Sequence, residues 1–263
     1  MSSIPLIAPN SQLSSFWNLQ ASSYDEHFTH RLLGQWLRQR VWEKMDHWLN
    51  NASHLLDLGC GTGEDAARFL RQGRSVVGVD ISPAMLEQAA NKAKAENLNI
   101  SLHCLSLDRL DQLATPKLFD GAYCNFGAIN CCRNPRFLAQ EVALRLRPQA
   151  RLIIVAMGPF CLLETLAHLA RGSWKKAWQR RGKGGTIPLR YDWHVSLKQL
   201  LGAHFRTLHV SALGAALPPT DFAHWIERFS KSARILAKVD RMVSCWPLAP
   251  YMSDHYLLVA EKR

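Results

Sequence analysis

A short, mostly apolar segment that runs directly into a glycine-rich loop constrains the fold of this chain more than any other feature of its sequence. The segment spans residues 54–58, and Gly59, Gly61 and Gly63 follow it at alternate positions before an apolar helical pattern begins. Glycine carries no Cβ atom, so such a loop can turn tightly and approach a ligand closely. The segment therefore predicts a strand, a ligand-binding turn and a helix.

The same alternation of strands and helices continues along the chain. Strands are expected at 54–58, 75–79, 100–105, 119–124, 151–157, 207–213 and 255–261, and helical patterns fall between them and before them, among others at 16–24, 31–50, 137–146 and 196–205. A strand, a helix and a further strand in this order favour parallel pairing with crossover helices. The predicted fold is α/β: a Rossmann-like, seven-stranded, mostly parallel sheet with helices on both faces and helical lid insertions.

The spacing of the glycines discriminates between nucleotide ligands. A dinucleotide site has the pattern G-x-G-x-x-G, and a P-loop ends in Gly-Lys-Ser or Gly-Lys-Thr. Here the pattern is G-x-G-x-G, with Asp57 two residues before Gly59. A carboxylate at this place attracts an ammonium group and repels a pyrophosphate. Asp80 ends the next strand, where an acid in a Rossmann-type site receives ribose hydroxyls.

Residues 55–63 (Leu-Leu-Asp-Leu-Gly-Cys-Gly-Thr-Gly) together with Asp80 resemble the class I S-adenosylmethionine-dependent methyltransferases. The chain is similar to the type 11-like subgroup, which modifies small molecules such as quinones. The resemblance covers residues 15–157 well and the rest only in plan. It implies S-adenosylmethionine as the cofactor, S-adenosylhomocysteine as its product, and no metal. It leaves the substrate open.

The resemblance also implies a set of cofactor-binding residues. Asp57 and Gly59 would hold the amino group of the cofactor. Asp80 would hold the ribose, and Ile81 and Met85 would flank the adenine. The complete predicted set is Tyr24, Asp57, Gly59, Cys60, Gly61, Gly63, Asp80, Ile81, Met85, Ser106, Leu107, Asn125 and Phe126.

Of three further segments of this set, two match the family pattern and one departs from it. Tyr24 matches the family's N-terminal tyrosine near the methionine end of the cofactor, and residues 125–126 match the position that faces the sulfonium. The loop after the third strand usually reads Gly-Asp-Ala in the family, whereas here it reads Leu-Ser-Leu-Asp over residues 105–108. Ser106 and Asp108 are therefore both candidates for the polar contact to the cofactor.

Methyl transfer needs an oriented acceptor and a site without water more than it needs a catalytic side chain. If the acceptor must lose a proton, His194 is the candidate general base, because a histidine can be neutral at cellular pH. The alternative is a satisfied or surface histidine, and His30 is a second, weaker candidate base. Asn130, Tyr191 and Trp193 are predicted to bind the acceptor, although Asn130 could equally cap a helix or turn.

The length of 263 residues fits one domain better than two. We expect residues 1–14 to be a flexible N-terminus and residues 15–263 to form a single methyltransferase domain. Within it, residues 15–157 are the cofactor-binding core. Residues 158–195 and 215–250 are predicted lid insertions over the acceptor site.

The first insertion is unusually basic. Its cations are Arg171, Lys175, Lys176, Arg180, Arg181, Lys183 and Arg190, with no acid between them. Trp174 and Trp178 stand four residues apart, on one helical face. A basic amphipathic helix of this kind can contact an anionic membrane surface over residues 171–190. The alternative is an ordinary lid whose aromatic side chains pack inward while its cations face water.

The overall charge and the cysteines bear on partners and location. The formal net charge of +11 suits an anionic partner, but no recognisable RNA-binding module accompanies the domain, so a nucleic acid is not expected. The seven cysteines lack the paired spacing of a zinc site. No signal peptide is evident. Free thiols in the cytoplasm are the prediction.

These observations predict S-adenosylmethionine-dependent methyl transfer to a small, lipophilic or aromatic metabolite. The reaction would be an in-line displacement in which positioning is the main catalytic effect. Two alternatives remain open. One is an RNA methyltransferase that uses the basic insertion, and the other is a non-catalytic, cofactor-binding partner protein.

Overall fold

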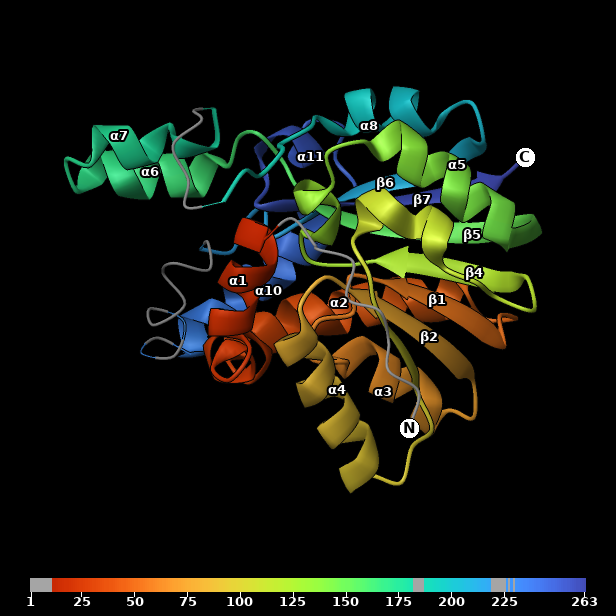
Figure 1. The fold of residues 1–263 in the computed structure, drawn as a ribbon. Helices are drawn as coiled ribbons and strands as arrows, with labels where there is room; N and C mark the ends of the chain where they lie inside the picture. Colours follow the sequence, from red (N-terminus) through yellow and green to blue (C-terminus); the bar gives the residue numbers. More distant parts are fainter. Residues whose placement is uncertain (1–10, 182–186, 219–225, 227, 229) are drawn as a thin grey trace.

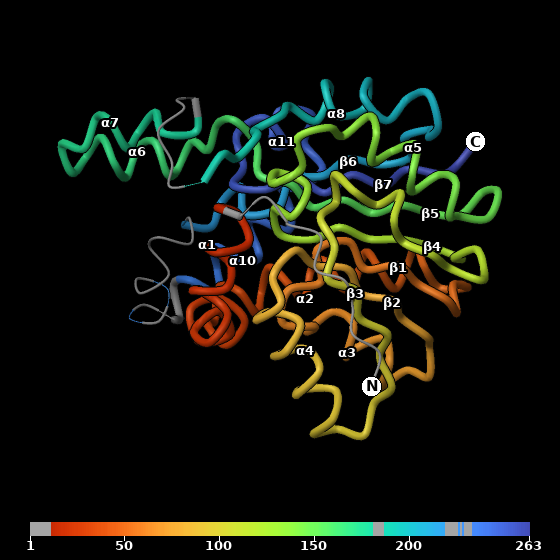
Figure 2. Tube along the Cα trace, in the orientation of Figure 1, coloured from red at the N-terminus to blue at the C-terminus, as the bar shows by residue number. Residues whose placement is uncertain are grey.

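In the computed structural model of the chain, one sheet runs through the middle of the molecule and helices cover both of its faces (Figures 1 and 2). The structure describes residues 11–181, 187–218, 226, 228 and 230–263. The strands are β1 His54–Leu58, β2 Ser75–Asp80, β3 Ser101–Cys104, β4 Phe119–Cys124, β5 Leu146–Met157, β6 Phe205–Leu213 and β7 His255–Lys262. The helices are α1 Ser11–Gln20, α2 Leu32–Trp48, α3 Glu64–Arg71, α4 Pro83–Ala95, α5 Pro135–Arg145, α6 Leu162–Ala170, α7 Trp174–Ala177, α8 His194–Leu201, α10 Ser230–Val243 and α11 Ala249–Met252.

The sheet has the strand order β3-β2-β1-β4-β5-β7-β6. Only β7 runs antiparallel to its neighbours, and the other pairs are parallel. The prediction of a seven-stranded, mostly parallel sheet is confirmed. The order of the strands reverses between β1 and β4, and ligands of such sheets bind beyond the carboxyl ends of the strands at this reversal.

Strand β1 shows how the two faces of the sheet are filled. Leu55 packs in the cluster that includes α2 and α3, whereas Leu56 and Leu58 pack in the cluster with α5 and α8. A parallel strand covered on both sides needs apolar residues at consecutive positions, which explains the run of leucines. In Figure 1, α2, α3 and α4 lie below the sheet and α5 and α8 above it.

Local sequence signals set the start of the helix after β2. Ser82 caps α4 by accepting a hydrogen bond from the Met85 amide, and Pro83 occupies the first helical position. Proline fits there because its fixed φ suits the helix and its missing N–H would have no partner. The cap places Asp80 and Ile81 at the carboxyl end of β2, beside the start of α4.

Both insertions leave from the same edge of the sheet. Met157 at the end of β5, His255 at the start of β7 and Leu213 at the end of β6 are in register. Strands β5 and β6 run in the same direction as β1 and β2, so the insertions emerge where the glycine-rich loop also lies. The hairpin formed by α6 and α7 extends away from the sheet (Figures 1 and 2).

The structure corrects two boundaries. Residues 11–14, predicted to be part of a flexible N-terminus, form the first turn of α1, and Leu13 and Ser14 are buried. The helix predicted at 16–24 ends at Gln20, before a turn and a short π-helix over Asp25–Thr29. Residues 1–10 lie outside the described residues.

The basic segment also differs from its prediction. It is not one helix, because a turn at Gly172 separates α6 from the four-residue α7. Trp174 and Trp178 are 68% and 43% exposed, so they do not pack inward as an ordinary lid would require. Lys183 in this insertion, like residues 219–225, 227 and 229 of the second one, lies outside the described residues.

All seven cysteines are free thiols, as predicted. Among the helices that the structure describes, none combines the length and the apolar character needed to cross a bilayer.

Candidate cofactor site

A cavity of about 640 Å³, its open mouth included, lies at the carboxyl ends of β1, β2 and β4. It lies where the strand order reverses, as expected for this kind of sheet. Ten of the thirteen residues in the predicted cofactor set line it: Tyr24, Gly59, Gly61, Asp80, Ile81, Met85, Ser106, Leu107, Asn125 and Phe126. Their contacts with a cofactor stay a prediction.

Asp80 organises the glycine-rich loop. Its Oδ2 accepts a hydrogen bond from the Gly61 amide at 2.9 Å, and its Oδ1 accepts one from the Ser82 amide at 2.9 Å. Burial raises the pKa of Asp80, and these backbone bonds oppose that rise. Gly61 has a φ of +51°, and a Cβ atom there would meet nothing within 4 Å. Gly61 thus leaves open space on the cavity side of the loop.

Two residues of the predicted set have structural contacts and do not line the cavity. Gly63 begins α3 with a φ of +76°, and a Cβ atom there would lie 2.8 Å from the Cβ of Ala89 on α4. The Sγ of Cys60 packs against Gly78 of β2, and burial raises the pKa of its thiol far above the usual value. Gly63 therefore allows α3 and α4 to pack closely, and Cys60 fills the space beside β2.

Asp57, the third such residue, lies buried in the end of β1. Its Oδ2 has no hydrogen bond of normal geometry among the described residues, and the nearby Tyr123 hydroxyl, which is also buried and unpartnered, interacts with this carboxyl and opposes the rise of its pKa. Burial and the negative charge of Asp65 raise the pKa of Asp57 well above its usual value. Asn125, which lines the cavity, also has a buried Oδ1 without a partner. Two unpartnered acceptors on strands that end at the cavity fit a ligand that carries an ammonium group.

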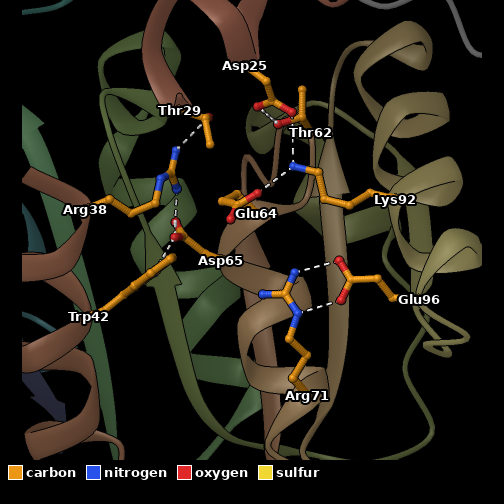
Figure 3. Close-up of polar contacts among 10 residues, drawn as sticks. All are labelled: Asp25, Thr29, Arg38, Trp42, Thr62, Glu64, Asp65, Arg71, Lys92 and Glu96. Atoms are coloured by element: carbon orange, nitrogen blue, oxygen red, sulfur yellow. Dashed lines mark hydrogen bonds and ion pairs between the residues drawn. The ribbon is translucent and has the colours of Figure 1, made fainter. Parts of the chain in front are cut away.

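A buried ion pair between Arg38 of α2 and Asp65 of α3 (Figure 3) contacts Asn125, a residue of the cavity lining. The Arg38 guanidinium donates to Oδ1 of Asp65 at 2.7 Å. Trp42 Nε1 donates to the same oxygen at 2.7 Å, and Asn125 Nδ2 donates to Oδ2 at 2.9 Å. Burial alone would raise the pKa of Asp65, but the Arg38 charge and these hydrogen bonds hold it below its usual value. The pair fixes the orientation of the Asn125 amide.

The same arginine supports a strained residue at the cavity. Phe126 has a φ of +48°, a left-handed conformation that is rare for a bulky side chain. The Arg38 guanidinium lies 4.9 Å from the centroid of the Phe126 ring, and the Phe28 ring lies edge-on at 5.0 Å. Strained conformations persist where the surroundings over-determine them, and they gather at functional sites.

A second group of charges joins the loop to the segment before α2 (Figure 3). Lys92 of α4 forms ion pairs with Asp25 at 3.0 Å and with Glu64 at 2.6 Å. The Thr62 hydroxyl donates to Asp25 at 2.7 Å. Burial opposes ionisation of Asp25, but its hydrogen bonds to Thr62 and Thr29 and the Lys92 charge lower its pKa. This group holds the π-helical turn, and with it the neighbouring Tyr24, beside the cavity.

Helix α1 covers the cavity, which the sequence did not predict. Leu13 and Trp17 line the cavity. The Ser14 hydroxyl donates to the Ile81 carbonyl at 3.1 Å, and the Ser82 hydroxyl donates to Asn18 Oδ1 at 2.6 Å. The apolar spacing within α1 was the available signal for these residues. Ala128 and Cys131, after β4, complete the lining.

The side chain of Asn130, which is predicted to bind the acceptor, contacts backbone groups at the base of the first insertion. Its Nδ2 donates to the carbonyls of Met157 and Arg190, and its Oδ1 accepts from the Met157 amide. All the polar groups of its amide thus have backbone partners, and Asn130 does not line the cavity. It joins the loop after β4 to the start and the end of the first insertion.

The candidate base His194 also lies away from the lining of the cavity. Its ring packs against Tyr251 at 4.4 Å and Tyr256 at 6.0 Å between centroids, and burial lowers its pKa. Trp193 packs on the same Tyr251. Tyr191 lies under the Arg180 guanidinium. Trp193 and His194 thus share Tyr251 as a neighbour, and neither they nor Tyr191 line the cofactor cavity.

The remaining alternatives from the sequence can be placed as well. Ser106 lines the cavity, whereas Asp108 accepts hydrogen bonds from the Arg133 and Asn134 amides before α5. Of the two candidates for the polar contact, the structure therefore puts Ser106 in reach. His30 is exposed at the end of the π-helical turn and does not line the cavity.

A buried cluster at the base of the first insertion contains side chains of the kinds that bind metal ions. Cys161, Glu164 and Asp254 bring potential ligand atoms within 4.8 Å of one another. Arg180, predicted as one of the surface cations of the lid, is buried here and pairs with both acids. The positive charge that this cluster needs is already supplied by the arginine, which also donates to the Gly158 and Asp254 carbonyls.

Comparison with known proteins agrees with this geometry. Residues 55–149 match the family described as methyltransferase domain. The chain is 35% identical over 121 residues to a ubiquinone/menaquinone biosynthesis C-methyltransferase from Dinoroseobacter shibae, covering 44% of the chain and 48% of that protein. It is 33% identical over 132 residues to a 2-phytyl-1,4-naphtoquinone methyltransferase from Trichormus variabilis, covering 47% and 57%. The chain thus spans about half the length of these curated relatives.

Solved structures share the fold over nearly the whole chain. A [4+2]-cyclase aligns with a TM-score of 0.65 at 19% identity, covering 100% of this chain and 99% of the other. Magnesium protoporphyrin IX methyltransferase from Synechocystis, solved with S-adenosylhomocysteine, aligns with a TM-score of 0.63 at 15% identity, covering 97% and 100%. At these identities the likeness shows the fold alone.

The fold, the glycine-rich loop and the matched sequence family together define a class of protein. Residues 55–149 match a methyltransferase domain, and the sheet that contains them has the Rossmann-like fold of the class I S-adenosylmethionine-dependent methyltransferases. The family assignment made from residues 55–63 and Asp80 is confirmed.

Proposed function

We propose that this protein transfers the methyl group of S-adenosylmethionine to a small, lipophilic or aromatic metabolite. The observation that supports it best is the cavity at the strand-order reversal, which ten residues of the predicted cofactor set line. When bound, the cofactor supplies an electrophilic methyl group on a positively charged sulfur. The residues of this chain bind it, orient it and keep water away.

The polar groups of the site suit the two ends of that cofactor. Asp57 and Asn125 offer unpartnered buried oxygens for the ammonium group. Asp80, already oriented by two backbone amides, is the acceptor for ribose hydroxyls. Ile81 and Met85 give the flat apolar walls that an adenine ring needs.

The groups around the mouth of the cavity favour positioning over acid–base chemistry. Burial raises the pKa of Tyr24 to about 12, so its hydroxyl stays neutral and can donate a hydrogen bond. Burial likewise raises the pKa of Cys131 to about 12, so this thiol is not a nucleophile at cellular pH. Orientation of two reactants can itself provide a large part of a rate enhancement.

The names of two relatives support the proposed acceptor class. Both names refer to quinones, and quinones and their ring precursors are flat and lipophilic. The mouth of the cavity in this chain is lined by Leu13, Trp17 and Phe126, which suit an acceptor of that kind. The acceptor itself stays to be found.

Cofactor binding is tested first by a thermal-shift titration with S-adenosylhomocysteine and, in parallel, with NAD. A ligand at a hundred times its dissociation constant stabilises the folded state by about 2.7 kcal/mol. We expect a rise in melting temperature with S-adenosylhomocysteine alone. Asp80→Asn should weaken its binding about tenfold or more, because a charged acceptor is lost. An equal shift with NAD would contradict the proposal. So would no shift in protein that mass spectrometry finds free of ligand.

Methyl transfer and its alternatives are separated by the fate of a labelled methyl group. Protein and labelled S-adenosylmethionine are incubated with cell extract, which is then divided into lipid-soluble, water-soluble and RNA fractions. We expect label in the lipid-soluble fraction. Label in RNA, with binding that weakens steeply in salt, would support the RNA alternative. Binding of the cofactor without transfer to any fraction would support the non-catalytic alternative.

A further inference from the structure

One face of α10 carries large apolar side chains that the fold leaves exposed. Ile235, Val239 and Met242 are 64%, 39% and 76% exposed and follow one another at steps of four and three residues, and Trp246, 64% exposed, follows three residues after the helix ends. Steps of this size place the three α10 side chains along a single helical face. We call these four residues the α10 stripe. Exposed apolar side chains grouped in this way mark interaction sites more often than isolated ones do.

The charges beside the α10 stripe are positive. Arg234, Lys238 and Arg241 are exposed on the same helix. Arg241 pairs with the exposed Glu43 of α2 at 3.0 Å. The acid of α10, Asp240, is fully buried and pairs with Arg40. The described outer surface of α10 therefore presents an apolar stripe with cations and no acid of its own.

The tip of the α6–α7 hairpin has the same character. Leu166 and Trp174 are 52% and 68% exposed, and the exposed cations Lys175 and Lys176 follow Trp174 directly. The hairpin and α10 belong to the two insertions that leave from one edge of the sheet. In Figure 1 both lie to the left of the sheet, on the side of the carboxyl ends of the parallel strands, where the residues that line the cofactor cavity also lie.

We propose that the α10 stripe docks the protein onto an anionic lipid bilayer, with the α6–α7 tip as a second, weaker contact. A helix with an apolar face and flanking cations inserts its apolar side chains at the boundary of headgroups and acyl chains, while its cations attract anionic lipids. Tryptophan suits this boundary because its ring is apolar and its N–H is polar.

Charge favours a bilayer over a second copy of the chain. In a symmetric dimer through this stripe, Arg234, Lys238 and Arg241 of both copies would come close together and repel. An anionic surface instead attracts all three residues. The formal net charge of +11 adds to this attraction over a longer range.

Docking goes beyond the proposed methyl transfer, since it needs neither the cofactor nor an acceptor. If the proposed function holds, docking has a further consequence that rests on it. The insertions that would touch the bilayer frame the edge of the sheet where the cavity opens. A lipophilic acceptor could then move from the bilayer to the site without crossing bulk water.

The test is co-sedimentation of the full chain with vesicles. One set is made of phosphatidylcholine alone, and the other of phosphatidylcholine mixed with phosphatidylglycerol. We expect binding to the anionic vesicles only, and binding that weakens as salt is added. Met242→Glu and Lys238→Glu should each weaken it about tenfold, because each replaces a favourable contact by a repelled carboxylate. Trp174→Glu should weaken it less.

Matched controls introduce the same charges elsewhere. Leu144→Glu on α5 and Lys94→Glu on α4 replace exposed residues far along the chain from the α10 stripe, and both should bind vesicles like the unmodified protein. Circular dichroism and the thermal shift with S-adenosylhomocysteine verify that each variant is folded. They also separate a failure of docking from a failure of the proposed cofactor site.

Several outcomes would overturn the proposal. Absence of binding to anionic vesicles, or equal binding to both sets, would do so. Unchanged binding by Met242→Glu and Lys238→Glu would remove α10 from the contact. If these variants instead turned a dimer into a monomer in light scattering and left vesicle binding unaltered, the α10 stripe would be a contact between copies.

Discussion

The two halves of the chain each bury an arginine, and they use it differently. Arg38 pairs with Asp65 beside the cofactor cavity and lies against the strained Phe126. Arg180 pairs with Glu164 of α6 and Asp254 before β7. The first arginine orients groups that face the cavity. The second fastens an insertion to the body of the protein, so a buried ion pair does not by itself mark a functional site.

Removing each arginine in turn tests the difference between them with the largest expected effect. Arg38→Ala and Arg180→Ala should each lower the free energy of unfolding by about 3–5 kcal/mol, because each leaves buried carboxylates unpaired. Urea denaturation measures this loss. Only Arg38→Ala should also weaken the binding of S-adenosylhomocysteine, measured by calorimetry at a temperature where both variants are folded.

The outcome that would contradict this difference is simple to recognise. If Arg180→Ala weakened ligand binding as much as Arg38→Ala did, the first insertion would be coupled to the cofactor cavity. The paired exposed residue Arg71, which bridges to Glu96 at the surface, provides the control. Arg71→Ala should change stability by less than about 1 kcal/mol.

A second prediction compares two buried aspartates, one near the cofactor cavity without a cationic partner and one paired with an arginine. Burial and Asp65 raise the pKa of Asp57, so its contribution to stability is present at low pH and is lost as the pH rises through the pKa of the folded state. Asp57→Asn should therefore raise the free energy of unfolding by about 1–3 kcal/mol above that pKa. The gain should shrink toward zero at lower pH.

Asp254 should show the opposite dependence. Burial opposes its ionisation, but His255 and Arg180 hold its pKa far below the usual value. Its contribution to stability is thus present above the unfolded pKa and is lost as the pH falls through the folded pKa. Asp254→Asn should destabilise at neutral pH. Thermal unfolding of both variants over roughly pH 2–8 covers the range below the unfolded carboxylate pKa, where the Asp254 contribution is lost, and the range above it, where the Asp57 cost appears. Equal signs would contradict the comparison.

The smallest expected effect concerns His194. It packs between aromatic rings and does not line the cavity, so His194→Gln should change stability by about 1 kcal/mol or less. Binding of S-adenosylhomocysteine should stay the same. Once an acceptor is known, lost turnover with unchanged ligand binding would restore His194 as the general base.

The sequence predicted the parts of the site whose geometry is local. The alternate glycines and Asp80 have fixed places because a tight turn at a strand end needs them, and the structure puts Gly61 and Asp80 in direct contact. The alternation of strands and helices likewise predicted that most of the sheet is parallel. It could not assign Gly63 to helix packing, since its neighbour Ala89 comes from another helix.

The sequence could not predict the partners of residues whose contacts come from distant segments. Arg180 looked like a surface cation because its partners Glu164 and Asp254 stand 16 and 74 residues away. Asn130 looked like an acceptor ligand, but backbone groups from distant segments occupy its amide. A pattern in one segment shows which residues share a face, but not what the rest of the fold brings against that face.

Helix α1 has a consequence for the time course of the reaction. It lies over the cavity through Leu13 and Trp17 and is fastened at the rim by the hydrogen bonds of Ser14 and Ser82. We expect a ligand that extends beneath α1 to leave faster when these contacts are weakened. The residence time of a bound product would then depend on how often one short helix opens.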